Sequence, residues 1–449
     1  MINVSSRRED RQPFPLDIPS RGWAHRGCVI IAIIVLLGFD GILKLLHVRD
    51  DDSQVARMLS IIFFTGLFAL SYLYWARRIS LLRELVSNQK LLVTIVAYCI
   101  VSVAWSSMQS TSIVRVMQLV GMTLLSATVV QMQVEDSGFS ISALLRSATV
   151  VVSVVALFYV LLFPEQSISV DSEDRLQGPY SHPNTLAQMS AFAVAVWLPR
   201  LRFAQSPSSR VPALLILGIQ VYLISVSGSA TGLTSLFFLV LLAIILQLPS
   251  GISSGVRKLL IASICVVLPL WYLLTANSPR EDIVDPITEE LGRDASLTGR
   301  LPLWYRLIAG FQEEGRLLFG FGYGGFWAAE EGPAVDMLYG TWTPQQAHNG
   351  YLDVLLQIGA VGLMLFLLFL FKVLRDAFRY ASRNPGEGLL YLYVVSIVLL
   401  QNFSETTFIR TVSLAWLAFV AAAFVVRRNQ ERGGELTSRS FAGRTRESH

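Results

Sequence analysis

The chain has 449 residues, of which 53% are hydrophobic and 15% are charged, and its mean hydropathy is +0.54. A soluble domain usually carries about a quarter charged residues, so this composition excludes an ordinary soluble protein. The net charge of +4 is modest and gives no indication of nucleic-acid binding.

The hydrophobic residues are concentrated in blocks that are long enough to cross a bilayer. A transmembrane helix needs about 20 predominantly apolar residues. The blocks are 28–46, 58–75, 91–108, 116–133, 147–163, 185–199, 211–227, 231–248, 259–275, 350–371, 388–402 and 411–426. We therefore predict an all-α polytopic membrane protein with about 12 transmembrane helices.

Charge placement orients these helices independently of their hydropathy. With the N-terminus in the cytoplasm, 25 of the 36 lysine and arginine residues fall on the inner side and 10 on the outer side. Cytoplasmic loops carry an excess of positive charge, so the chain is predicted to be N-in and C-in. The resulting segments are a cytoplasmic N-terminal segment (1–27), helices one to nine (28–275, with an outer loop at 164–184), a large periplasmic loop (276–349), helices ten to twelve (350–426) and a disordered cytoplasmic tail (427–449).

The N-terminal segment, the cysteines and one pair of charged residues lead to structural predictions. The first apolar run is preceded by a hydrophilic segment of about 27 residues and is not followed by a small-residue cleavage site, so we expect no cleavable signal peptide. Cys28, Cys99 and Cys265 fall in predicted helices, which predicts neither a disulfide nor a metal cluster. Asp40 and Lys44 are four residues apart in the first helix. Intramembrane charges are functional candidates by default, but we interpret these two as a structural pair.

The large periplasmic loop contains a predicted amphipathic helix. Thr298 is a suitable N-cap for a helix that begins near Arg300. An apolar stripe then follows at helical spacing: Trp304, Leu307, Ile308 and Phe311. The stripe predicts a helix that lies along the membrane surface.

A glycine-rich run, GFGYGGF (Gly320–Phe326), follows this helix. No predicted strand precedes it, so it is a weak candidate for dinucleotide binding. We interpret the run as a tight backbone turn, and a phosphate-cradling nest is compatible with that interpretation.

The end of the large loop reads QQAHNGYLDVLLQIGAVGLMLF, and His348 and Asn349 lie where the chain re-enters the membrane. Asn349 or a neighbour is a suitable N-cap for the following helix. The partial positive charge of a helix N-terminus favours a neutral imidazole, which is able to remove a proton from a hydroxyl. Residue chemistry alone leaves a second interpretation open, in which His348 only hydrogen-bonds a loop carbonyl.

The spacing of His348-Asn349, Gly359 and Gly362 resembles a motif of the O-antigen ligase and O-antigen polymerase superfamily, most closely its exopolysaccharide polymerase (ExoQ-like) branch. Four further stretches resemble the family in the same order: RLQGPYSHPN (175–184), SGSAT (227–231), TGR followed by a tryptophan (298–304) and NFSE (402–405). The resemblance covers 175–405, and the first third of the chain supports only the membrane class.

This resemblance implies a GT-C-like membrane glycosyltransferase of the bacterial inner membrane, with its active site facing the periplasm. Its substrate would be a glycan carried by undecaprenyl pyrophosphate. His348 would be the general base for the acceptor hydroxyl, and direct attack would invert the anomeric carbon. Arg175 and Arg300 would bind the pyrophosphate. Without the family, each arginine is better explained as an interfacial anchor or a partner of the acidic residues in the loop.

The resemblance also provides weaker candidates for substrate binding, namely His182, Asn184, Asn349 and Glu405. His182 precedes a proline at a helix entry, which is also compatible with a purely structural role. Glu405 would hold an arginine or the acceptor sugar. Neither a metal nor another cofactor is expected, because two arginines supply the cations that a divalent ion supplies in many glycosyltransferases.

Three function classes follow. The leading prediction is a polymerase that joins lipid-linked oligosaccharide repeats into exopolysaccharide. The second is a ligase that transfers a finished glycan to lipid A core or to a protein, and the third is a non-catalytic lipid-glycan transporter. The polar candidates lie at the outer boundary and not at mid-membrane depth, which favours an enzyme. The predicted partners are the lipid-linked glycan, the acceptor glycan and the bilayer, with chain-length regulators and export proteins as further candidates and no nucleic acid.

Overall fold

The computed structural model describes residues 54–135, 139–169, 175–180, 182–204, 206–248, 300–328, 332–338, 346–410 and 413–428, with five isolated positions between 253 and 263. The predicted span 28–46, nearly all of the span 259–275, the part of the large loop before Arg300 and the tail from 429 onward lie outside the described residues. The Asp40–Lys44 pair, Cys28 and Cys265 therefore also lie outside them.

The described residues are largely helical. Their elements are α2 (Gln54–Ala76), α3 (Ile79–Ser87), α4 (Lys90–Ser102), η1 (Val103–Trp105), α5 (Gln109–Glu135), α6 (Ile141–Leu162), η2 (Glu165–Ser167), β1 (Ile168–Ser169), β2 (Arg175–Leu176), α7 (Pro183–Phe203), α8 (Pro207–Val226), α9 (Ala230–Leu246), α12 (Arg300–Glu313), α13 (Pro333–Met337), α14 (Gly350–Arg383) and α15 (Pro385–Gln401). A last helix covers 414–428. The two short strands pair antiparallel, with Ser169 opposite Arg175.

Ten of the predicted apolar blocks fall on these helices, although α14 extends 12 residues beyond its block and α5 and α6 begin 7 and 6 residues before theirs. Among the described residues, α5, α6 and α14 are long and apolar enough to cross a membrane by themselves. α3 and α4 pass the same test together, although they are bent by 108°. The fold is consistent with a polytopic membrane protein, while the number of twelve helices and the N-in orientation stay predictions.

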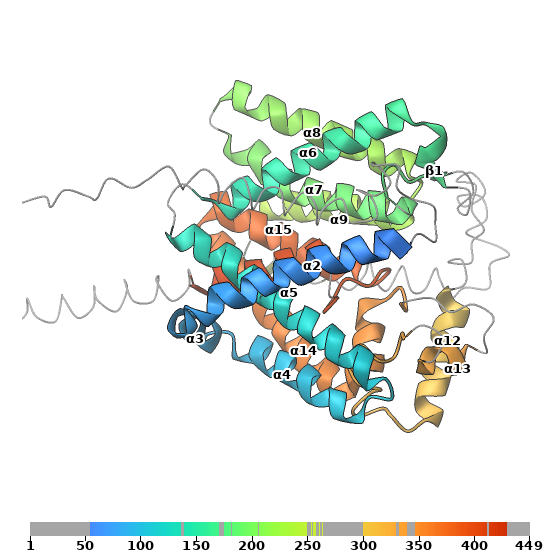
Figure 1. Ribbon diagram of the computed structural model, residues 1–449. Helices are drawn as coiled ribbons and strands as arrows, with labels where there is room; N and C mark the ends of the chain where they lie inside the picture. Colours follow the sequence, from blue (N-terminus) through green and yellow to red (C-terminus); the bar gives the residue numbers. More distant parts are fainter. Residues whose placement is uncertain are drawn as a thin grey trace, which may run out of the picture.

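The long helices run side by side and form a bundle (Figure 1). α15 packs against both α14 and α7, and α7 in turn contacts α8 and α9. α12 and α13 lie at one end of the bundle, and α3 lies at the other end (Figure 1).

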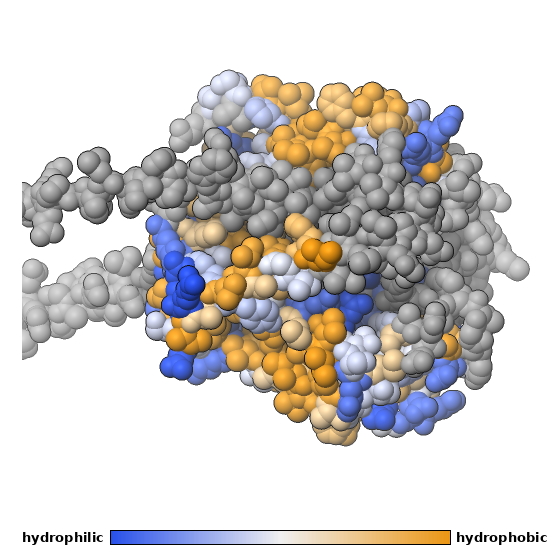
Figure 2. Space-filling model, in the orientation of Figure 1, coloured by the Kyte–Doolittle hydropathy of each residue, from blue (hydrophilic) through white to orange (hydrophobic). Residues whose placement is uncertain are grey.

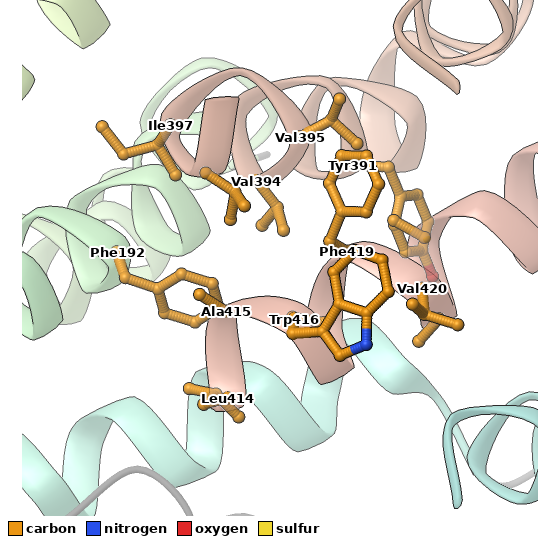
Figure 3. Close-up of a cluster of buried hydrophobic side chains, with 14 of the residues drawn as sticks. Phe192, Tyr391, Val394, Val395, Ile397, Leu414, Ala415, Trp416, Phe419 and Val420 are labelled. Carbon is orange, nitrogen blue, oxygen red and sulfur yellow. The ribbon is translucent and has the colours of Figure 1, made fainter. Parts of the chain in front are cut away.

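The helix 414–428 is packed into the bundle by large side chains (Figure 3). The rings of Trp416 and Phe419 stack, with their centroids 5.9 Å apart and their planes at 12°. Val394 on α15 and Phe192 on α7 belong to the same buried cluster. Lipid tails are as apolar as these side chains, so close van der Waals packing is what joins the helices.

Apolar side chains also cover much of the outside of the bundle. In the view of Figure 2, hydrophobic residues lie along the sides of the helices, and hydrophilic residues gather mainly toward the two ends. Leu214 and Leu215 on α8 and Leu367, Leu368 and Phe371 on α14 are exposed. Such a surface suits a lipid environment and would promote aggregation in water.

Helix α14 is broken at Gly359, which has φ +69° and ψ −175°. The chain at Leu317–Phe321 fills this break. Ala360 N donates to Leu317 O at 2.8 Å, and Phe321 N donates to Leu356 O at 3.0 Å. A Cβ atom at position 359 would collide with the carbonyl oxygen of Leu318, so the glycine is required by both its conformation and its surroundings.

The run Gly320–Phe326 forms a turn that packs between helices. Gly320, Gly322 and Gly324 all have positive φ, which favours glycine. The backbone N–H of Tyr323 donates to Ser102 Oγ, and that of Gly324 donates to Gln357 Oε1, both at 2.9 Å. These N–H groups serve packing, which supports the interpretation as a tight turn.

Candidate active site

The predicted site residues meet at the end of the bundle where α7 and α14 begin and α15 ends. The first residue of α12, Arg300, also reaches this point. Glu405 lies at the centre of the cluster, in the loop that follows α15. Its polar contacts join segments that are far apart in the sequence.

The carboxylate of Glu405 contacts three of the other candidates. Arg300 Nη2 lies 2.8 Å from Oε1, and the amide nitrogen of Asn184 donates to the same oxygen at 3.2 Å. His348 Nδ1 lies 3.2 Å from Oε2. Glu405 is only 8% exposed, so each of these contacts compensates for water that the carboxylate has lost.

Glu405 is ionised at neutral pH. Burial by itself raises the pKa of this carboxyl, but the hydrogen bond to His348 and the positive charge of Arg300 outweigh it and lower the pKa to about 2. An ionised carboxylate only accepts hydrogen bonds, so the network assigns the proton of the contact to His348 Nδ1. In the neutral imidazole, Nε2 then carries the free lone pair.

The backbone holds His348 in an unusual conformation, with φ +51°. The preceding residue, Ala347, is bound on both sides: Trp304 Nε1 donates to its carbonyl at 2.7 Å, and its N–H donates to Asp353 Oδ1 at 3.2 Å. The imidazole side chain keeps 26% of its surface exposed. A rigid backbone with a partly open ring is suited to a side chain that must meet a substrate.

Asn349 is the N-cap of α14, as the sequence suggested. Its side-chain oxygen accepts from the N–H groups of Tyr351 and Leu352, both at 3.1 Å. Gly350 N donates to Asn402 O at 2.8 Å and approaches Glu405 O at 3.1 Å. The cap therefore joins the start of α14 to the loop that carries Glu405, and a role of Asn349 in substrate binding stays a prediction.

Arg175 is connected to the same cluster through Asn184. Its Nη2 donates to Asn184 Oδ1 at 3.1 Å, and its Nε donates to Ser227 O at 3.0 Å. Ser229 Oγ donates to the same Asn184 oxygen at 2.9 Å and caps α9. The two predicted arginines thus lie on either side of the Asn184–Glu405 contact.

His182 is the N-cap of α7, and its Nδ1 accepts from Asn184 N at 3.1 Å. Burial lowers the pKa of His182; the charges of Arg175 and Arg300 lower it further, while Glu405 opposes the shift. A neutral ring is required for this acceptor role. The side chain thus positions Asn184, and a contact between His182 and substrate stays a prediction.

A protein-family model described as O-antigen ligase matches residues 213–367. This match over about a third of the chain supports the resemblance to the O-antigen ligase and polymerase superfamily. No curated protein matches the sequence. The matched region contains Arg300, His348 and Gly359, whereas Arg175 precedes it and Glu405 follows it. Members of the superfamily are membrane glycosyltransferases, and a particular closeness to the exopolysaccharide branch stays a prediction.

Two residues that help to position His348, namely Asp353 and Gln346, were not among the candidates predicted from the sequence. Asp353 is 2% exposed, and Trp327 Nε1 donates to its Oδ1 at 2.6 Å. An acid in the first turn of an apolar span is a functional candidate by the general rule for intramembrane charges, so this signal was present. Gln346 also lies near His348 Nδ1, at 3.4 Å, and accepts from Arg410 Nη1 at 2.6 Å; nothing in the sequence indicated this contact.

The predicted surface helix is present as α12 from Arg300, the first described residue of this segment, and its predicted N-cap, Thr298, lies outside the described residues. Trp304, Leu307 and Phe311 of its apolar stripe are buried in a cluster with Phe321 and Phe326, whereas Ile308 is 42% exposed. The stripe is therefore used for packing within the protein, and contact of this helix with the membrane surface stays a prediction.

The arrangement offers a base, an orienting carboxylate and two cations. Among the described residues, no group of three or more His, Cys, Asp or Glu side chains is arranged to hold a metal ion. A carboxylate that accepts from one imidazole nitrogen orients the ring and stabilises the imidazolium that forms after proton uptake. The guanidinium groups are suited to an anionic leaving group nearby.

Proposed function

We propose that this protein is a polysaccharide polymerase that transfers undecaprenyl-pyrophosphate-linked oligosaccharide repeats onto an acceptor glycan at the periplasmic face of the inner membrane. The observation that supports this proposal best is the contact of His348 Nδ1 with the ionised carboxylate of Glu405, which is itself held by Arg300 and Asn184. The choice of a polymerase rests on the stretch HNGYLDVLLQIGAVGL and its resemblance to the exopolysaccharide branch.

In the proposed reaction, His348 Nε2 removes the proton from an acceptor hydroxyl. The oxygen attacks the anomeric carbon of the lipid-linked glycan, and a glycosidic C–O bond forms. The bond between that carbon and the pyrophosphate oxygen breaks, and its electron pair leaves with the lipid pyrophosphate. The proton ends on the imidazole, beside the Glu405 carboxylate, and a single displacement inverts the anomeric configuration.

The arginines stabilise the negative charge that develops on the leaving pyrophosphate. Arg300 is buried and paired with Glu405, and Arg175 is held by Asn184 and Ser227. These contacts fix the direction of each guanidinium before the substrate arrives, which reduces the cost of reorganisation during the reaction. The base and the two cations would thus belong to one connected network.

The test is polymer output in a strain that lacks the native protein. The strain would receive wild type, His348→Ala, Arg175→Ala or Arg300→Ala at matched membrane levels. Arg306→Ala is a matched control, because Arg306 is exposed on the same helix as Arg300. We expect polymer from wild type and from the control, and single lipid-linked repeats in the other three strains. Loss of general base catalysis should reduce the rate about 100-fold to 10,000-fold.

The accumulating species separates the alternatives. A ligase uses the same base and cations and differs only in its acceptor, so its inactive variants would accumulate full-length polymer that is not attached to lipid A core or protein. A transporter would release no lipid pyrophosphate from substrate when the purified protein is assayed. Normal polymer from all three variants would show that the site has been misplaced.

A further inference from the structure

A second polar site lies at the end of the bundle opposite His348. It is a cavity of about 500 Å³ between the first turns of α6 and α15 and the last turn of α7. Arg146, Arg200 and Glu387 line it, together with neutral side chains such as Gln133 and Ser142. Arg200 follows Asn184 by 16 residues along α7, so the cavity lies about 24 Å from the candidate active site, close to the thickness of a bilayer core.

The two arginines of this cavity have no carboxylate partner within the described parts of the chain. Arg146 donates to the neutral hydroxyl of Ser142 at 3.1 Å. Its guanidinium is near enough to that of Arg200 for the two to repel each other, and it is attracted by the carboxylate of Glu387. Neither arginine takes part in a salt bridge with any described carboxylate.

Glu387, the one acidic side chain among the described residues that line the cavity, is hydrogen-bonded to two tyrosines. Its two oxygens accept from the phenol groups of Tyr380, at 2.9 Å, and Tyr391, at 3.3 Å. The cavity therefore presents two planar cationic groups that form no salt bridge with a described carboxylate, and Glu387 supplies one negative charge against their two positive charges. Such a pair of guanidinium groups suits a phosphate, which arginine binds through two parallel hydrogen bonds.

An apolar groove of about 320 Å³ begins beside the polar cavity. α2, α5, α6, α15 and the helix 414–428 form its walls, and Leu144, Val394 and Leu414 are among its lining residues; Val394 and Leu414 are drawn in Figure 3. Tyr391 lines the groove and donates to Glu387, which lines the polar cavity, so the two spaces meet at the first turns of α15.

We propose that this end of the bundle binds one anionic phospholipid, with its phosphate between Arg146 and Arg200 and an acyl chain in the apolar groove. Charge complementarity selects an anionic head, and the adjoining groove selects a molecule that carries a long hydrocarbon chain. The site is also at the depth of a headgroup region if α6 and α7 cross the bilayer, and anionic headgroups attract basic residues there. The proposal is independent of the glycosyltransferase reaction.

The test is native mass spectrometry of the full-length protein in detergent, with dioleoylphosphatidylglycerol as the probe. We expect wild type to retain one lipid more tightly than the rest. Arg146→Gln and Arg200→Gln should each weaken that binding about tenfold, because each removes a charge-assisted hydrogen bond. Arg202→Gln is the matched control, since Arg202 is on the same turn of α7 but contacts Leu246 O and the ring of Phe203 and does not line the cavity.

Two further arms identify the ligand. Ala418→Phe places a ring in the groove and should reduce retention of the dioleoyl lipid, with little effect on a dihexanoyl lipid that has the same head. Inorganic phosphate should compete only weakly with the long-chain lipid. Equal binding of both chain lengths together with full displacement by inorganic phosphate would indicate a site for a free anion and would overturn the lipid assignment.

Retention that is unchanged in the Arg146→Gln/Arg200→Gln protein would overturn the proposal altogether. Arg200 is exposed, so Arg200→Gln should fold and provides the test even if Arg146→Gln does not. Arg200→Lys preserves the charge and should recover most of the binding, which a purely structural role would not predict. If Ala418→Phe lost the lipid but all arginine variants retained it, the groove would bind the acyl chain without a phosphate site, and the proposed headgroup contact would be wrong.

Discussion

A pair of arginines lies near each end of helix α7, and the two pairs are in different situations. At one end, Arg300 is 2.8 Å from the buried carboxylate of Glu405, and Arg175 is bound to Asn184. At the other end, Arg146 and Arg200 line a cavity in which the described residues provide no salt bridge. The carboxylate of Glu405 fixes the direction of Arg300 before a ligand arrives, whereas Arg146 and Arg200, without a salt bridge to a described carboxylate, can take an anion as their partner. We therefore propose chemistry at the first end and anion binding at the second.

Removing the carboxylate of the first end would break this contrast most strongly. Glu405→Ala leaves Arg300 buried without its counter-ion and releases His348, and we expect the folded state to lose about 3–5 kcal/mol. Thermal or denaturant unfolding of the purified protein measures the loss. Glu313→Ala, on the exposed side of α12, should stay close to wild type. A loss of less than about 1 kcal/mol would show that the ion pair contributes no more than a surface pair.

Acid should weaken the same end without any substitution. The pKa of Glu405 is lowered from 4.5 to about 2 in the folded protein, so its carboxylate stabilises the fold above pH 4.5. This stability is lost as the pH falls from 4.5 toward 2, by up to about 3 kcal/mol. Unfolding midpoints between pH 6 and pH 3 should fall more steeply for wild type than for Glu405→Gln. Parallel curves would contradict the assignment.

A substitution at Gly359 measures how much the break in α14 depends on its glycine. Gly359→Ala adds a Cβ that collides with Leu318 O at a residue with φ +69°, and we expect a cost of about 1–3 kcal/mol. Gly218→Ala on α8 is the matched control, because a Cβ there meets no atom within 4 Å. The control should be neutral or slightly stabilising. Equal free energies of unfolding for the two variants would show that the segment Leu317–Phe321 can move away from the break at little cost.

The smallest change in stability should come from giving the second end its own carboxylate. Ser142→Asp places an acid one turn from Arg146 and in the first turn of α6, at a position that is 8% exposed. The attraction to the guanidinium and to the helix N-terminus opposes the cost of burying the carboxylate, so the net change in stability should be less than about 1 kcal/mol. Retention of phosphatidylglycerol should nevertheless fall, because the protein would then neutralise its own arginine. Unchanged retention in native mass spectrometry would show that Arg146 does not hold the phosphate. Ser142→Asn controls for size without adding charge.

Much of the fold could be predicted because its signals are local. The apolar blocks found in the sequence coincide with α2, α4–α9, α14, α15 and the helix 414–428. The helix α12 and the cap at Asn349 were also predicted from short patterns. The broken helix at Gly359 was not, because the glycine alone does not reveal that Leu317–Phe321 fills the break.

Sequence alone determined the helical membrane class and the identity of the candidate residues. A backbone without water must satisfy its own hydrogen bonds, so long apolar blocks become helices wherever they lie in the chain. Only the tertiary structure decided which candidates meet. Arg300 and Glu405 are 105 residues apart in the sequence, and Asn184 and Glu405 are 221 residues apart, yet Arg300 and Asn184 both donate to the carboxylate of Glu405. Helix packing sets such distances, and packing depends on side chains from every neighbouring helix at once.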